Sequence, residues 1–182
     1  MRAFNKVIID KTHDLLSSFK PNSGYYEALG DKGFETLKKT IQYIKTNYPT
    51  VPTILDAKRA DIGPTNEKYF EAIFAYLDVD AVTVNPYLGA EAMQPFLARK
   101  DKGIIFLIKT SNPGSGELQN LLVENGQPLW HVIAKKVATE WNTHQNCGIV
   151  VGATYPNDLR EVRTIVADMP ILLPGIGAQG GS

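Results

Sequence analysis

Residues 104–114 read IIFLIKTSNPG, and this stretch decides the fold class. Its first five residues are apolar and uncharged, as is typical of a strand buried on both faces. A polar cluster containing a proline and a glycine follows at once and ends the strand. Similar changes from a short strand-like run to a polar loop recur along the chain. We therefore expect six strands, centred near residues 19, 55, 83, 106, 150 and 172.

Helical patterns separate the expected strands. Apolar residues recur at helical spacing through Leu37, Ile41 and Ile44, and Pro64 suits the first turn of a later helix. Strands joined by crossover helices run parallel, so the chain is predicted to be an α/β protein. No linker or block of charge divides it, and we expect one domain over residues 1–182. The expected helices cover residues 4–16, 34–44, 64–77, 90–97, 129–141 and 158–167.

Two parallel architectures are open to such a chain, a doubly wound open sheet and a (β/α)8 TIM barrel. An open sheet carries ligand chemistry mainly at its switch point, whereas a barrel gathers every strand end around one mouth. Polar clusters follow nearly every expected strand, which favours the barrel. Six strands do not close an eight-stranded barrel, so we expect strands two to seven only.

Composition excludes several classes of protein. Lys and Arg number 19, as do Asp and Glu, so the balanced charge argues against a nucleic-acid module or a polybasic membrane binder. No run of 18 apolar residues occurs, and from the opening residues we expect no signal peptide. The single cysteine, Cys147, cannot form an internal disulfide, which is typical of a cytoplasmic protein.

The stretch most informative about chemistry is DAKRADI, residues 56–62. Residues two apart on a strand share a face, so Asp56 and Lys58 are predicted to point together into the barrel mouth. Asp61 can turn back toward them or reach a neighbouring subunit, and Lys20 ends the preceding strand. A lysine held beside carboxylates suits a reaction in which negative charge develops on a substrate carbon. A salt bridge that merely caps the strand remains the alternative.

Two further loops could bind substrate. Residues 174–181, PGIGAQGG, offer closely spaced backbone N–H groups and an amide, as in phosphate-binding loops of barrels. Residues 109–114 offer hydroxyl and amide groups that could contact a polar heterocycle, although both loops could also be ordinary turns. The three histidines lack metal-ligand spacing, and no P-loop, dinucleotide or zinc motif occurs.

Taken together and in order, these motifs resemble the orotidine 5′-phosphate decarboxylase family, in its bacterial type 2 branch. The resemblance implies metal-free and cofactor-free conversion of orotidine 5′-monophosphate to UMP in pyrimidine biosynthesis, by a cytoplasmic homodimer. The stretches that carry it are residues 19–23 with 26–27, 56–63 with Thr65, 84–89, 109–114, 151–154 and 174–181.

The resemblance also implies a role for each site residue. Lys58 would protonate C6 of the pyrimidine, Asp56 would face the substrate carboxylate, and Lys20 would hold Asp56 and the ribose. Asp61 and Thr65 would act across the dimer interface. The implied substrate-binding residues are Thr65, Ser111, Pro174, Gln179 and Asn85.

The chain departs from the family pattern at both ends. The family has a first strand with a ribose-binding aspartate and an eighth-strand region with a phosphate-binding arginine, and neither is found here. We therefore expect the 182 residues alone to be weakly active or inactive. Two alternatives remain: a metal-dependent sugar-phosphate decarboxylase or aldolase-like synthase of the same barrel group, and a catalytically dead remnant that binds a nucleotide or dimerises.

Overall fold

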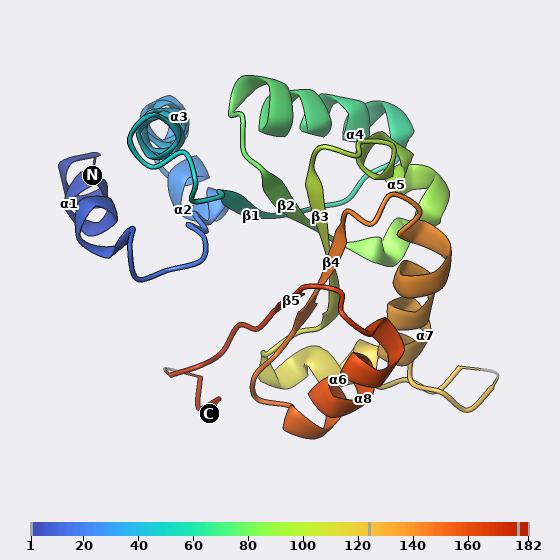
Figure 1. Ribbon diagram of the computed structural model, residues 1–182. Helices are drawn as coiled ribbons and strands as arrows, with labels where there is room; N and C mark the ends of the chain where they lie inside the picture. Colours follow the sequence, from blue (N-terminus) through green and yellow to red (C-terminus); the bar gives the residue numbers. More distant parts are fainter. Residues whose placement is uncertain (1, 124, 178, 182) are drawn as a thin grey trace.

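A parallel sheet forms the centre of the protein in a computed structural model that describes residues 2–123, 125–177 and 179–181 (Figure 1). Each strand is short and is followed by a loop that leads into a helix, except the last. The strands of these described residues are β1 (Ile54–Arg59), β2 (Ala81–Val84), β3 (Gly103–Lys109), β4 (Cys147–Val151) and β5 (Ile171–Leu172).

The order of the strands settles which parallel architecture is present. Each strand pairs in parallel with the next one along the chain, in the order β1-β2-β3-β4-β5. A doubly wound sheet reverses its strand order at a switch point, and this sheet does not. The sequential order is that of consecutive units of a (β/α)8 barrel, so the predicted fold class is confirmed as part of such a barrel.

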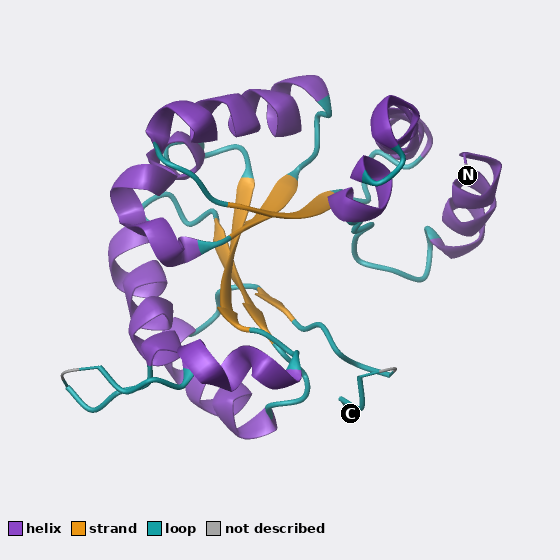
Figure 2. Cartoon of the chain, turned by 180° about the vertical axis from the view of Figure 1, so that it is seen from behind, coloured by secondary structure: helices purple, strands orange, loops and turns teal. Residues whose placement is uncertain are grey.

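Helices cover the outer side of the curved sheet (Figure 2). The longer helices are α1 (Arg2–Thr12), α3 (Gly30–Asn47), α4 (Gly63–Phe70), α5 (Gly89–Leu97), α7 (Leu129–Lys136) and α8 (Pro156–Val166). The shorter turns are α2 (Ser23–Glu27), α6 (Gly116–Gln119), the 3₁₀ turns η2 (Pro86–Leu88) and η3 (Pro113–Ser115), and the π-helical turns η1 (Glu71–Tyr76) and η4 (Val137–Trp141).

The core lies between the sheet and these outer helices. In β3 the side chains of Ile104, Phe106 and Ile108 are buried, whereas Ile105 and Leu107 on the other face are only partly buried. This period of two puts the apolar core on one face of the strand. The expectation that such strands are buried on both faces is therefore wrong for β3, because its inner face borders the cavity described below.

Two further expectations about elements need correction. Residues 18–20 do not form a strand, although Phe19 bridges Thr53 in parallel and Asn22 bridges Asp56. Pro21 interrupts the pairing because it has no N–H to donate. The helices expected over 64–77 and 129–141 both widen to π geometry in their last turns, where Leu77 N donates to Ala72 O and Asn142 N to Val137 O.

Within the described residues, no helix is both long and apolar enough to cross a membrane.

Candidate active site

A carboxylate held between two ammonium groups lies at the carboxyl end of β1. Lys20 Nζ lies 2.9 Å from Asp56 Oδ2, and Lys58 Nζ lies 2.5 Å from Asp56 Oδ1. The segment before α2 runs alongside β1, and Asp56 N donates to Pro21 O, which brings Lys20 next to the strand. Asn22 Nδ2 also contacts the carboxylate and lies 3.3 Å from Asp56 Oδ2. Three of the four predicted charges thus come together, with Lys20 and Lys58 each in contact with Asp56.

The environment of Asp56 keeps its carboxylate ionised. Burial acts to raise its pKa, since the side chain is only 11% exposed, but the hydrogen bonds and charges of Lys58 and Lys20 outweigh it. The net result is a pKa below the usual value for an aspartate. Both lysines keep part of their surface open, so each ammonium can reach a ligand as well as Asp56.

The strand reaches this arrangement by a bulge, which corrects the simple alternation expected from the sequence. Between the paired positions Leu55↔Val82 and Arg59↔Val84, three residues of β1 oppose one residue of β2. Lys58 lies in the bulge with a φ of 49°, in the left-handed region that an ordinary side chain seldom adopts. A bulge re-aims side chains locally, and here it turns Lys58 back toward Asp56.

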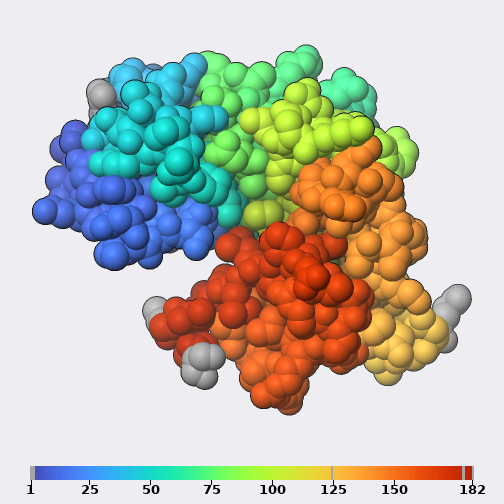
Figure 3. All heavy atoms as spheres, in the orientation of Figure 1, coloured from blue at the N-terminus to red at the C-terminus, as the bar shows by residue number. Residues whose placement is uncertain are grey.

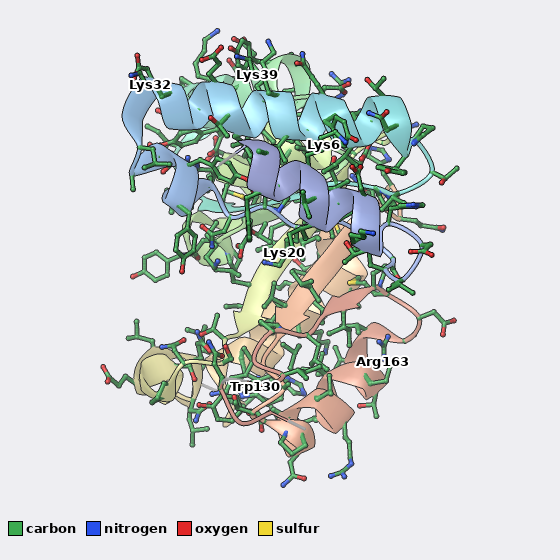
Figure 4. The ribbon with its side chains drawn as sticks, turned by 90° about the vertical axis from the view of Figure 1, so that its left-hand side faces the viewer. Lys6, Lys20, Lys32, Lys39, Trp130 and Arg163 are labelled. Carbon is green, nitrogen blue, oxygen red and sulfur yellow. The ribbon has the colours of Figure 1, made fainter. Side chains whose placement is uncertain are left out.

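The charged cluster opens into a cavity of about 430 Å³. Figure 3 shows a recess between the N-terminal and C-terminal segments, and Figure 4 shows Lys20 between the N-terminal helices and the strands. The lining includes the predicted residues Lys20, Asp56, Lys58, Ser111, Pro174 and Gln179. Six of the nine proposed site residues therefore meet in one cavity.

Hydrogen bonds join the loops that follow β3, β4 and β5 around this cavity. Gly152 N donates to Lys109 O over 2.7 Å, and Ala153 N donates to Pro174 O over 2.8 Å. A Cβ on Gly152 would lie 2.7 Å from Ser111 Cα, so only glycine allows this approach. Gly175 has a φ of 99° beneath Ser111, a conformation that favours glycine. Ala178 of the glycine-rich stretch lies outside the described residues.

Asp61, Thr65 and Asn85 are placed elsewhere. None of them is among the described residues that line the charged cavity. Asp61 directly precedes Ile62, whose side chain is 60% exposed, and Thr65 lies in the first turn of α4. Asn85 caps η2 by accepting a hydrogen bond from Tyr87 N, and it lines a neighbouring cavity of about 330 Å³.

Two lining residues that contact Asp56 were not singled out as site residues from the sequence, Asn22 and Thr83. Asn22 contacts Asp56 as described above, and Thr83 is buried on β2 with its hydroxyl against Asp56. The available signal for Thr83 was a single polar residue inside the apolar strand AVTV, residues 81–84. Among the described residues, no three His, Cys, Asp or Glu side chains come together as a possible metal site.

Sequential parallel strands, outer helices and a charged cavity at the strand carboxyl ends are the arrangement of a (β/α)-barrel protein. A family model described as "Orotidine 5'-phosphate decarboxylase / HUMPS family" matches residues 2–182. The chain belongs to this family.

Named relatives agree with this assignment. The chain is 49% identical over 178 residues to the orotidine 5′-phosphate decarboxylase of Herpetosiphon aurantiacus, covering 98% of this chain and 66% of the relative. It is 50% identical over 179 residues to that of Cellvibrio japonicus, covering 98% and 64%. It superposes on Leishmania donovani UMP synthase with a TM-score of 0.95 and 39% identity, covering 100% of this chain and 40% of that one. The chain thus spans slightly less than two thirds of the two bacterial relatives and 40% of the Leishmania chain.

Proposed function

We propose that the protein decarboxylates orotidine 5′-monophosphate to UMP without a metal or cofactor. The observation that carries the proposal is the Asp56 carboxylate between the Lys20 and Lys58 ammonium groups, at 2.9 and 2.5 Å, in a cavity at the strand carboxyl ends. Membership of the decarboxylase family supports it.

In the proposed reaction, the bond between C6 and the carboxylate carbon of the pyrimidine breaks and CO₂ leaves. The electron pair stays on C6, and Lys58 Nζ delivers the proton that forms the new C6–H bond. The ring delocalises this carbanion poorly, so a fixed ammonium beside C6 stabilises the transition state more than the bound substrate. Asp56 holds Lys58 in place and lies against the substrate carboxylate.

The rest of the cavity suits a nucleoside monophosphate. Ser111 and Lys20 both line the cavity, and in the proposed complex Ser111 would contact the pyrimidine and Lys20 the ribose. Pro174 and Gln179 belong to the loop after β5, where positive-φ glycines at 175 and 177 leave the backbone open to an anion. Binding energy from the remote phosphate would then help to orient the ring at Lys58.

Asp61 and Thr65 fit a role across a homodimer interface. Asp61 precedes the exposed Ile62 and Thr65 lies in the first turn of α4; both are partly exposed, and neither lines the cavity of its own chain. Mixing Asp61→Ala with Lys58→Ala protein should restore part of the activity that each variant lacks, if two subunits build each site. No restoration in mixed dimers would contradict this.

The buried free thiol of Cys147 supports a cytoplasmic location, which cell fractionation tests.

The metal-dependent relatives of the same barrel group are disfavoured by charge. A divalent cation bound to Asp56 would lie beside both Lys20 and Lys58, whose ammonium groups repel it. Activity that is lost on adding EDTA and restored by a divalent metal would favour such a relative instead.

The test follows the absorbance decrease as orotidine 5′-monophosphate is converted, without added metal. Lys58→Ala should lower kcat by about 10²- to 10⁴-fold, the usual contribution of a positioned acid. Lys135→Ala is the matched control, because Lys135 is exposed on α7 and remote from the cavity lining.

Because weak activity or none is expected of the 182 residues alone, turnover is sought at high protein concentration. A folded wild-type chain without turnover would overturn the proposed activity for this chain. Calorimetric binding of UMP in that case would support the second candidate, a nucleotide-binding barrel segment. The intact charged cluster and cavity are the observations that favour this candidate.

A further inference from the structure

The bulge in β1 leaves two backbone donors without a strand partner. In a regular ladder, the N–H groups of neighbouring strands donate to carbonyl oxygens. Here Ala57 N and Lys58 N both donate to Thr83 Oγ1, each over 3.0 Å. The Thr83 hydroxyl thus takes the place of a strand carbonyl at the point where Lys58 turns back toward the cavity.

The same hydroxyl contacts the catalytic carboxylate. A threonine hydroxyl has two lone pairs and one hydrogen. The two amides of the bulge occupy both lone pairs, so the hydrogen is left to donate to Asp56 Oδ1, which lies 3.0 Å away. Thr83 is only 1% exposed, so water does not compete for these three bonds.

Thr83 therefore fixes two things at once. It holds the backbone from which the Lys58 side chain extends, and it orients the Asp56 oxygen that Lys58 Nζ contacts. A valine would fill nearly the same volume, but it would leave two partly buried amides without their acceptor and remove one donor from Asp56.

We propose that Thr83 is a positioning residue for the proposed decarboxylation, setting the place of the Lys58 ammonium through the Asp56 carboxylate and the bulge backbone. The inference rests on the proposed function for its catalytic consequence. It makes a separate statement about Asp56 that does not depend on turnover.

The catalytic consequence is tested by kinetics of Thr83→Val and Thr83→Ser. Loss of the hydroxyl should lower kcat by about 10- to 100-fold, as loss of a hydrogen bond to a charged group does. KM should change less than kcat, because Ser111 and the loop after β5 remain. Thr83→Ser keeps the hydroxyl and should stay within a few-fold of wild type.

The second readout is the Asp56 carboxyl titration, followed by carbon NMR of labelled aspartate. A donor to the charged form lowers a carboxyl pKa, so Thr83→Val should raise the Asp56 pKa and Thr83→Ser should leave it unchanged. The control is Thr53→Val. Thr53 is equally buried and donates to Asp80, so its loss should lower stability without moving Asp56. If Thr83→Val does not fold, Thr83→Ala is compared with Thr83→Ser by the same criteria.

The outcomes separate the two proposals. If Thr83→Val raises the Asp56 pKa and Thr83→Ser leaves it unchanged, the positioning of Asp56 is supported, whether or not the chain is active. If the wild-type chain shows no turnover, the proposed function is overturned and the positioning of Asp56 still stands. If the wild type is active and Thr83→Val has the same kcat, the positioning role is overturned and the proposed function is not. An unchanged Asp56 pKa in the variant without the hydroxyl, or a serine variant as impaired as the valine one, also overturns the positioning role.

Discussion

At the scale of single residues, the loop that carries Ser111 depends on a buried ammonium. Lys109 ends β3 with no exposed surface, and its Nζ donates to Asn120 Oδ1 over 2.7 Å. The same Nζ lies 4.3 Å from the centroid of the Tyr155 ring. The Tyr155 hydroxyl in turn contacts Asn112 O. The charge therefore joins the end of α6, the loop after β4 and the loop around Ser111.

The substitution Asn120→Ala tests how much the hydrogen bond from the Lys109 ammonium to Asn120 contributes to stability. A hydrogen bond to a charged group contributes about 1.5–3 kcal/mol, so we expect the free energy of unfolding to fall by about 2 kcal/mol. In a Lys109→Met background the same change should cost well under 1 kcal/mol, because no buried charge is left without a partner. Urea denaturation of the four proteins measures the difference. An equal cost in both backgrounds would show that Asn120 acts independently of Lys109.

The site residues that could be predicted from the sequence are charged residues at the carboxyl ends of expected strands. Lys20, Asp56 and Lys58 were expected together because parallel strands bring their carboxyl ends to one edge, and they are in contact. Thr83 was not expected, because its role depends on a bulge in the neighbouring strand. That bulge results from pairing between β1 and β2, and neither strand's own pattern encodes it.

At the scale of elements, apolar periodicity identified the five observed strands and located the helices that cover them. It failed for residues 18–20, where pairing is limited to isolated bridges, and it did not reveal α2, which is capped by Asn22. Elements this short depend on tertiary contacts and caps, because a segment of three to five residues is too short to show a hydrophobic period.

The attachment of α1 to α3 is a second element-scale feature, and it depends on Asp10. The carboxylate accepts hydrogen bonds from Tyr43 and Tyr48 on Oδ1, at 2.6 and 2.8 Å, and from Lys6 on Oδ2. The hydrogen bonds from Lys6, Tyr43 and Tyr48 lower the pKa of Asp10 to about 2. In return, the bond to Asp10 raises the pKa of Tyr48 to about 12.

Asp10→Ala should release α1 from α3. Its amides should exchange faster with deuterium, and the Tyr48 phenol should titrate closer to 10, read from tyrosinate absorbance. Asp14→Ala is the matched control, because Asp14 is exposed just beyond α1. Because the folded pKa of Asp10 is depressed, the attachment is fully present above pH 3.8 and is lost as the pH falls through about 2. Unchanged exchange of α1 in Asp10→Ala would assign its attachment to other contacts.

At the scale of the whole molecule, the two ends of the chain meet at one cavity. Lys20 and Asn22 line it from the N-terminal segment, and Leu172, Pro174 and Gln179 line it from the segment after β5. Figure 3 shows the recess between these segments. Because residues of both segments line the cavity, a ligand that fills it would contact both and join them.

UMP binding should therefore stabilise the molecule and protect both segments together. At a ligand concentration of about 100 times Kd, the free energy of unfolding should rise by about 2.7 kcal/mol, and Tm by roughly 5–10 °C for a chain of this size. Deuterium exchange should slow in residues 19–22 and 172–177 alike. Lys20→Ala should remove both effects, and Lys135→Ala should retain them. Protection confined to one segment would place the ligand on a single wall of the recess, and the cavity would then not be the element that couples the two ends.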